Sequence, residues 1–306
     1  NKMVKIYETI IVGGGLAGCT AAIYAARKRM DYLLLTEYLG GQFMESWEIF
    51  NYPGITQIKG VDFADRIKEQ LEFNGVKPKE GVTVNQIKKH GKNFLLNTTS
   101  GNFLTKTIIL ATGSHPKTLD VPGEKKFRHK GVTYCAICDG PLFRGKDVAV
   151  IGGGNSALEA ADFLLKIARR IYVLNINPKF KAHRSLLENA ERDKKVKLLY
   201  NAKTTRILGE KFVSGLEYQQ NGKKKVLKVQ GIFVEIGRVP NTGFLKGFVK
   251  LDEHQHILVD CQTNTSVPGV FAAGDCSSVH EYQYVIAAGQ GCIALLKAAR
   301  YLAGKK

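Results

Sequence analysis

Acidic residues are scarce in this chain of 306 residues, with 27 Asp and Glu against 45 Lys and Arg, which gives a formal net charge of +18. Proline is also rare, at 8 residues, and no run of 18 consecutive apolar residues occurs. Together with 44% hydrophobic residues, this composition excludes disordered, collagenous and coiled-coil proteins. The short apolar runs predict no membrane-spanning helix. The lack of a basic segment followed by an apolar core predicts that no secretory signal is present.

Cysteine is the next residue in short supply. Six cysteines in a chain of this length are too few for a disulfide scaffold. They are Cys19, Cys135, Cys138, Cys261, Cys276 and Cys292. Only Cys135 and Cys138 are close in sequence, so we predict a cytoplasmic protein in a reducing compartment with one special cysteine pair.

The chain length predicts about two domains, each large enough to bury a core. The excess of positive charge favours an acidic partner, a nucleic acid or an anionic surface, and the composition alone does not choose among them.

A repeat is the strongest organisational signal in the sequence. Each copy consists of an apolar strand, a glycine-rich turn, a helix and a second strand. The first copy has these elements at 7–12, 13–18, 19–28 and 31–36, and the second at 147–151, 152–157, 158–168 and 170–174. Two such βαβ units predict an α/β protein with two dinucleotide-binding folds.

The remaining segments surround these two copies. A helix is predicted at 61–74 and another at 284–302. Strands are predicted within 82–110 and at 195–200, 205–208, 212–219, 224–228, 232–236 and 270–273, with hinges near 117–123 and 243–251.

The first glycine turn carries the pattern Gly13-x-Gly15-x-x-Gly18 and is followed by Glu37 at the end of the second strand. Small residues let backbone N–H groups approach a pyrophosphate, and the helix N-terminus favours its negative charge. A carboxylate at the position of Glu37 can bind ribose hydroxyls. The alternative is that these glycines only shape the turn.

Cys135 and Cys138 are separated by two residues, which places their sulfur atoms within reach of a disulfide. The pair is a redox pair, half of a metal site or inert. No second CxxC or nearby histidine pair completes a zinc set, and His129 and Cys261 are poorly spaced for one. The pattern therefore favours redox chemistry without a metal, and a helix starting here would lower the pKa of one thiol.

Two aspartates are further candidate site residues, one after the cysteine pair and one after a predicted strand. Asp139 comes directly after Cys138 and either moves the proton of thiolate chemistry or shapes the turn before Gly140. Asp275 follows a strand and either binds a cofactor at the edge of the sheet or caps the next segment.

The sequence resembles the low-molecular-weight thioredoxin reductases, which are flavoprotein pyridine nucleotide-disulfide oxidoreductases of class II. The shared landmarks span nearly the whole chain and occur in the same order. They are the turn 13–18, Gly40-Gly41-Gln42, Asn51-Tyr52-Pro53-Gly54, Ala111-Thr112-Gly113, Cys135-Ala136-Ile137-Cys138-Asp139-Gly140, the turn 152–157, 237–242 and Ala272-Ala273-Gly274-Asp275.

The resemblance implies two Rossmann-like (three-layer ββα) domains, the second inserted in the first. The FAD-binding domain would span 1–116 and 246–306, and the pyridine-nucleotide-type domain 117–245. It implies an FAD site made by the residues Gly13, Gly15, Leu16, Ala17, Gly18, Glu37, Gly41, Gln42, Asn51, Thr112, Gly113, Asp275, Gln283, Tyr284 and Val285. It further implies that Cys138 faces the flavin, that Cys135 attacks the partner's disulfide, and that the protein is a homodimer alternating between two domain orientations.

The second nucleotide site departs from the family. Members that use NADPH carry His-Arg-Arg and a further Arg where this chain has the segment 175–181, with Lys181 at the place of the further Arg. Guanidinium groups suit the 2′-phosphate, and an acidic residue near Asn175 would suit an NAD ribose; both are missing. The site would consist of Gly152, Gly154, Asn155, Ser156, Ala157 and Asn175, and the choice between NADPH and NADH stays open.

A second departure lies before the last helix, where the family's Arg-Gln-Ala reads Gln283-Tyr284-Val285. Tyr284 either covers the flavin ring or packs as an ordinary aromatic residue.

These departures leave the electron donor open among a nicotinamide nucleotide, ferredoxin, which some members use, and another donor. Ferredoxins are acidic, and the clusters at 88–89, 125–128 and 223–225 would steer them if these lysines are more than solvated surface.

The predicted function is an FAD-dependent thioredoxin-disulfide reductase. The alternatives are a flavin disulfide reductase with a peroxide-reducing or glutaredoxin-like partner, and a basic nucleic-acid-binding protein. No helix-turn-helix, zinc-finger or RNP-type pattern supports the last of these.

Overall fold

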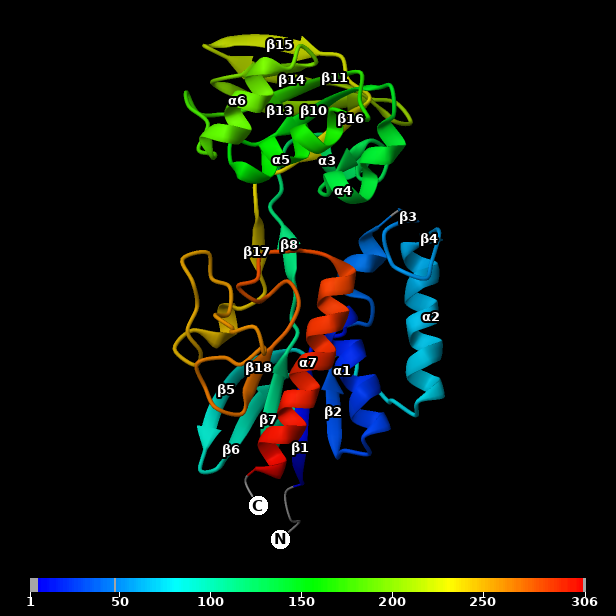
Figure 1. The fold of residues 1–306 in the computed structure, drawn as a ribbon, viewed down its shortest axis with the longest axis vertical. Helices are drawn as coiled ribbons and strands as arrows, with labels where there is room; N and C mark the ends of the chain where they lie inside the picture. Colours follow the sequence, from blue (N-terminus) through cyan, green and yellow to red (C-terminus); the bar gives the residue numbers. More distant parts are fainter. Residues whose placement is uncertain (1–4, 47, 305–306) are drawn as a thin grey trace. The chain divides into compact units, whose positions relative to one another are not determined.

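The computed structural model describes residues 5–46 and 48–304. The chain forms two compact units, residues 1–115 with 239–306, and residues 116–238. The first and last stretches of the sequence, coloured blue to cyan and orange to red in Figure 1, belong to the first unit. The predicted α/β class with two Rossmann-like folds, one inserted in the other, is confirmed.

The first unit is built on a sheet in the order β2-β1-β7-β6-β5, with β18 also paired to β7. Its strands are β1 Ile6–Val12, β2 Tyr32–Leu35, β5 Val84–His90, β6 Asn93–Thr98, β7 Gly101–Leu110 and β18 Val270–Ala272. Strands β1, β2, β7 and β18 run parallel, whereas β5, β6 and β7 form an antiparallel meander. The long strand β7 pairs with β6 through its first half and with β18 through its second half.

Both faces of this sheet are buried, which explains the uninterrupted apolar sequence of its central strands. Ile11 and Ile109 face a core shared with two helices, α1 (Leu16–Arg27) and α7 (Tyr284–Ala303). Ile10 and Ile108 face the opposite core, which the meander residues cover. A third helix, α2 (Gly60–Phe73), belongs to the same unit.

Helices α1 and α7 pack closely, and Figure 1 shows them side by side. A Cβ added to Gly291 would lie 2.1 Å from the carbonyl oxygen of Ala17, so glycine is required at this contact. Among the described residues, α7 alone is long and apolar enough to cross a membrane by length and composition. It does not form an uninterrupted apolar run in the sequence because Gln290, Lys297 and Arg300 lie within it.

The second unit repeats the same plan with three layers. Its parallel sheet has the order β12-β11-β10-β16-β9, with a separate antiparallel sheet β13-β14-β15. The strands are β9 Val132–Thr133, β10 Asp147–Ile151, β11 Arg170–Leu174, β12 Val196–Leu199, β13 Ala202–Gly209, β14 Val213–Gln220, β15 Lys223–Leu227 and β16 Gly231–Val234. Val148 and Val150 face a core with helices α5 (Asn155–Leu164) and α6 (Arg184–Arg192), whereas Ala149 and Ile151 face the antiparallel sheet.

Short elements complete both units. They are η1 Gly41–Glu45, β3 Glu48–Ile49, β4 Ile58–Lys59, α3 Glu124–Phe127, α4 Ala136–Asp139, η2 Gly140–Phe143 and η3 Gly243–Leu245. The chain passes between the units within two paired strands, β8 (Ser114–Pro116) and β17 (Arg238–Pro240).

The second predicted domain boundary, at 245/246, lies after the division that the structure makes at 238/239. The intervening residues belong to the first unit because they bind it. Asn241 donates a hydrogen bond from Nδ2 to the carbonyl oxygen of Thr112 (2.9 Å), and Leu245 is buried in the core beside β1 and β7. The first division, at 115/116, lies next to the predicted one at 116/117.

Both nucleotide-fold helices begin three residues before their predicted starts at Cys19 and Leu158. Helix α1 begins at Leu16 and α5 at Asn155, directly after Gly15 and Gly154. The glycine motif therefore runs into the first helical turn, which brings the helix N-terminus up to the glycine turn.

Candidate active site

A cavity of about 600 Å³ lies within the first unit, at the ends of β1, β2, β7 and β18. These parallel strands end at the same edge of the sheet, which is where open α/β sheets bind their ligands. The volume is in the range of small-molecule sites. The cavity is therefore the candidate cofactor site of this unit.

The first glycine turn forms one wall of the cavity, and each glycine has a different steric reason. A Cβ on Gly13, which has φ of 117°, would lie 2.2 Å from the carbonyl oxygen of Ala111. A Cβ on Gly18 would lie 1.8 Å from the carbonyl oxygen of Gly13. A Cβ on Gly15 would meet no described atom within 4 Å, so it would point into open space beside the helix N-terminus.

This arrangement fits the pyrophosphate of a dinucleotide. Gly15 is the N-cap residue of α1 and offers no side chain to the first-turn N–H groups. Those N–H groups and the helix dipole favour an anion at this point. Glu37 lines the same cavity just after β2, as the ribose-binding prediction requires.

Most of the residues predicted to bind FAD come together in this cavity. Its lining includes Gly13, Gly15, Leu16, Ala17, Glu37, Gly41, Gln42, Thr112, Gly113, Asp275, Gln283 and Tyr284. The lining does not include Gly18, Asn51 or Val285. Gly18 instead packs beneath the turn, and Val285 is 47% exposed.

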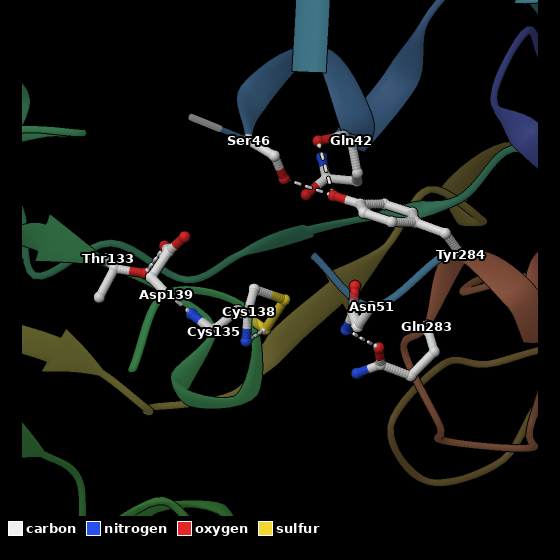
Figure 2. Close-up of a disulfide and its surroundings, with 9 residues drawn as sticks. All are labelled: Gln42, Ser46, Asn51, Thr133, Cys135, Cys138, Asp139, Gln283 and Tyr284. Atoms are coloured by element: carbon white, nitrogen blue, oxygen red, sulfur yellow. Dashed lines mark hydrogen bonds between the residues drawn. A yellow bond between two sulfur atoms is a disulfide. The ribbon is translucent and has the colours of Figure 1, made fainter. Parts of the chain in front are cut away.

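Asn51 contacts a residue that lines the cavity. Its Nδ2 donates a hydrogen bond to Oε1 of Gln283 (3.1 Å), which Figure 2 shows. Asp275 accepts a hydrogen bond from Oγ of Ser114 (3.3 Å), and both residues line the cavity. Sequence reasoning missed Ser114, although it lies two residues after the predicted motif residue Thr112.

Tyr284 begins α7 and lies at the edge of the cavity. Its hydroxyl lies 2.5 Å from Oγ of Ser46, and it donates to the carbonyl oxygen of Gln42 at 3.4 Å (Figure 2). Its ring also meets Phe43 edge to face, with 6.4 Å between the ring centroids. These contacts give Tyr284 a packing role, while covering the flavin stays a prediction.

The cysteine pair lies in the second unit. Cys135 and Cys138 form a disulfide, with 5.3 Å between their Cα atoms (Figure 2). Cys135 is the N-cap of the single-turn helix α4, and its Sγ accepts a hydrogen bond from the backbone N–H of Cys138 (3.2 Å). The single helical turn therefore brings the two cysteines close enough to form the disulfide.

Asp139 ends this helix and accepts a hydrogen bond from Oγ1 of Thr133. Burial raises the pKa of the Asp139 carboxyl above its ordinary value, and the hydrogen bond from Thr133 and the charge of His129 oppose this rise. The Asp139 carboxyl therefore stays protonated to a higher pH than a free aspartate does. The carboxyl of Asp139 is thus engaged with Thr133, and proton transfer between Asp139 and the cysteines stays a prediction.

Glu235 is a second carboxyl group beside the cysteine pair, and sequence reasoning missed it. It follows directly after β16 (Gly231–Val234) and accepts a hydrogen bond from the backbone N–H of Ala136, the first residue of α4. Burial raises the pKa of Glu235 to about 7. An acidic residue straight after a buried strand was the available signal, since Asp275 was found by that argument.

Replacing Glu235 with glutamine is expected to flatten the pH dependence of stability. In the folded state the pKa of this carboxyl is raised to about 7. Its contribution to the free energy of unfolding is therefore complete below the ordinary pKa of a glutamate and is lost as the pH rises through 7. Between pH 5 and pH 8 the wild-type protein should lose about 2 kcal/mol relative to Glu235→Gln. Urea unfolding of both proteins at the two pH values measures this difference. An equal change in the free energy of unfolding of the two proteins would contradict it.

The second glycine turn also precedes a helix, but its surroundings differ. A Cβ on Gly152 would lie 2.2 Å from the carbonyl oxygen of Glu235, and Ala157 is fully buried. Asn155 accepts a hydrogen bond through Oδ1 from the backbone N–H of His183 (2.8 Å), and Ser156 is exposed. These contacts hold the segment after β11 against the turn.

Asn175 organises that same segment. It is buried, donates from Nδ2 to the carbonyl oxygen of Lys179 (2.8 Å) and accepts from the backbone N–H of Asn177 (3.0 Å). A Cβ on Gly153 would lie 2.3 Å from its Oδ1, so the amide packs directly on the turn. Its amide is thus engaged within the loop, and ribose binding by Asn175 stays a prediction.

One nucleotide-type fold has a cavity lined by its glycine turn. The other carries a disulfide on a short helix, near two carboxyl groups whose pKa burial raises. This combination is that of a flavin-dependent disulfide oxidoreductase. The chain belongs to the pyridine nucleotide-disulphide oxidoreductase family, whose model matches residues 7–295. This confirms the family predicted from the sequence.

Known proteins similar to the chain agree with this assignment. It is 38% identical to the F subunit of alkyl hydroperoxide reductase of Staphylococcus aureus (strain MSSA476), over 97% of this chain and 59% of that protein. It is 40% identical to an NADH dehydrogenase of Bacillus subtilis (strain 168), over 97% of this chain and 58% of that protein. The chain thus spans about three fifths of the length of these curated relatives.

The fold is also similar to the crystal structure of thioredoxin reductase from Streptococcus pyogenes MGAS5005. The TM-score is 0.92 at 34% identity, and the match covers 98% of this chain and 99% of that chain.

Proposed function

We propose that this protein reduces the disulfide of a thioredoxin-type partner, with electrons that pass from a nicotinamide nucleotide through FAD to the Cys135–Cys138 disulfide. The observation that carries the proposal is this disulfide, set at the start of a helical turn that Asp139 ends and whose first N–H, that of Ala136, donates a hydrogen bond to Glu235.

The cavity of the first unit would hold the cofactor. The N–H groups at the start of α1 would bind the pyrophosphate, Glu37 the ribose, and Asp275 a further polar group. FAD, when bound, supplies a carrier that accepts two electrons from the donor and passes them to a disulfide. The chain itself supplies the position of the cofactor and the proton groups around the sulfur atoms.

The cysteines would then carry the thiol chemistry. Two electrons break the Cys135–Cys138 bond and leave two thiolates. Asp139 would protonate the Cys138 thiolate, and it would take this proton back when Cys138 later attacks. The Cys135 thiolate attacks one sulfur of the partner's disulfide, forms a mixed disulfide and releases the partner's other sulfur as a thiolate. Cys138 then attacks Cys135, re-forms the internal disulfide and releases the partner's second thiolate.

The acceptor is proposed to be thioredoxin because the thioredoxin reductase of Streptococcus pyogenes matches this chain over almost the whole length of both. The alternative is a peroxide-reducing partner, which the similarity to a component of alkyl hydroperoxide reductase favours. Parallel assays with oxidised thioredoxin and with an oxidised peroxiredoxin, at equal concentrations, separate the two acceptors by their kcat/KM values.

The donor is expected to be NADH. The segment after β11 carries Asn175, Ile176 and Asn177 where NADPH-using members carry charged residues, so no guanidinium is in place for a 2′-phosphate. When the purified protein is mixed anaerobically with each donor, NADH should bleach the visible flavin band at least about 10-fold faster than NADPH, since 1.4 kcal/mol of lost binding gives a factor of ten. Bleaching by reduced ferredoxin alone would overturn the nicotinamide proposal.

A gain-of-function variant sharpens this test. Ile176 is 58% exposed, so the double variant Ile176→Arg, Asn177→Arg has room for two guanidinium groups. It should shift the preference toward NADPH by about 10-fold or more, because guanidinium binds phosphate with two parallel hydrogen bonds. The matched control is Ile176→Gln, Asn177→Gln, which adds length without charge and should leave the preference unchanged.

A further inference from the structure

Three side chains with metal-binding atoms meet in the first unit. They belong neither to the lining of the cofactor cavity nor to the surroundings of the cysteine pair. They are Asp252, His256 and His280, and one ligand atom from each lies within 4.8 Å of the others. The backbone brings them together, since Leu251 bridges Ile257 in a tight reversal and Ile257 bridges Ser277. The cluster thus joins the reversal 251–257 to the segment between β18 and α7.

Asp252 is oriented by the reversal in which it sits. Its Oδ1 accepts hydrogen bonds from the backbone N–H groups of His254 (2.8 Å) and His256 (2.9 Å). This leaves Oδ2 facing the cluster, where it lies 2.9 Å from Nε2 of His280. A carboxylate held in this way is preorganised as a ligand.

His256 is the buried member of this cluster. The residue is 2% exposed, and its Nε2 lies 3.0 Å from the hydroxyl of Tyr282. Its Nδ1 is buried and makes no hydrogen bond to any atom in the described part of the chain; Oδ1 of Asp252 lies 3.6 Å away. A buried polar atom without a partner costs free energy, and an ion at this point would remove that cost.

We propose that Asp252, His256 and His280 bind one divalent transition-metal ion, for which Zn²⁺ is the best probe. Two imidazoles and one carboxylate are a ligand set that Zn²⁺ accepts, with a water molecule as the fourth ligand. Mg²⁺ and Ca²⁺ prefer sites made of oxygen atoms and would bind poorly here. In the tautomer of His256 whose Nε2 donates its hydrogen to Tyr282, Nδ1 presents its lone pair to the ion.

The simpler alternative is an ion pair between Asp252 and a protonated His280. That pair accounts for the 2.9 Å contact, but it leaves Nδ1 of His256 without a partner. A metal ion satisfies all three groups at once. Because Tyr282 both contacts His256 and lines the cavity, the ion would fasten the segment that leads into the cofactor site.

Zinc binding to the oxidised, FAD-loaded protein tests the proposal by titration calorimetry. The background is Cys261→Ser, because Cys261 is an exposed free thiol that would bind zinc by itself. We expect one Zn²⁺ per chain and no comparable binding of Mg²⁺. His280→Asn should weaken Zn²⁺ binding at least about 100-fold, since removing even a group that supports a ligand costs 10–100-fold.

His280 is the decisive position because its side chain is 43% exposed and its φ is 60°, a conformation that asparagine tolerates. Loss of binding in this variant therefore does not come from unfolding. His256→Ala should lose binding as well, and unchanged flavin content will show that it is folded. The matched control His90→Ala removes an exposed histidine of the same unit and should bind Zn²⁺ as the parent does. A parent without saturable binding, or equal affinity in His280→Asn, would overturn the proposal.

Discussion

Replacing Cys138 with serine is expected to abolish disulfide turnover while leaving FAD bound and reducible. A serine oxygen cannot form the internal disulfide, so electrons have no route from the flavin to the partner. The rate of thioredoxin reduction should fall by at least about 1,000-fold, the scale on which catalysis fails when a covalent step is removed. Bleaching of the flavin by the donor should continue, since the cofactor cavity belongs to the other unit.

The two cysteines are distinguished by what each serine variant can still do. In Cys138→Ser the Cys135 thiolate still attacks the partner, and the mixed disulfide is not resolved, so a covalent complex should appear on a non-reducing gel. Cys135→Ser should lose turnover equally but form far less of this complex. The control Cys292→Ser removes a partly buried free thiol and should keep most of the activity. A complex formed only by Cys135→Ser would reverse the assigned roles.

The parts of the fold that were predictable from sequence are those that local patterns determine. Strands β10 and β11 have the predicted bounds, because a short apolar run ends at a glycine turn or a polar residue on each side. The second domain boundary was less predictable, because it depends on where Asn241 and Leu245 bind in three dimensions. Nothing in the local sequence marks those contacts.

The same distinction applies to the candidate site. Residues in motifs, such as Gly13 and Cys135, were found because short spacings determine what they do. Glu235 was missed although it follows a strand, because its chemistry comes from burial and from the N–H of Ala136, which is distant in sequence. The cluster around His256 was missed because its ligands lie on two separate segments. The sequence spacing that argues against a metal site concerns the cysteines, whereas Asp252, His256 and His280 are brought together only by the fold.

The first glycine turn allows a test that separates folding from cofactor binding. A methyl group at position 18 would lie 1.8 Å from the carbonyl oxygen of Gly13, so Gly18→Ala must displace α1 or β1. It is expected to cost about 3 kcal/mol of stability, the upper range for overpacking a core, and to lose FAD as a consequence. Thermal unfolding and flavin content of the purified protein measure both effects.

Gly15→Ala is expected to behave differently. Gly15 has φ of −75°, and an added Cβ meets no described atom within 4 Å, so apoprotein stability should change by less than about 0.5 kcal/mol. The methyl group would nevertheless occupy the space through which a pyrophosphate approaches the backbone, and FAD affinity should fall by about 100-fold. Fluorescence titration of apoprotein with FAD measures this affinity.

Gly154→Ala is the matched control in the second unit, because Gly154 is likewise the N-cap of a nucleotide-fold helix and its nearest contact to an added Cβ is 3.9 Å away. It should bind FAD as the parent does and bind NADH more weakly. If Gly15→Ala weakens only FAD binding and Gly154→Ala weakens only NADH binding, the first turn is assigned to FAD and the second to NADH. If Gly154→Ala lost FAD while Gly15→Ala retained it, the assignment of the two units would have to be reversed. If neither variant changed nucleotide binding, the open space beside Gly15 would not be a phosphate site.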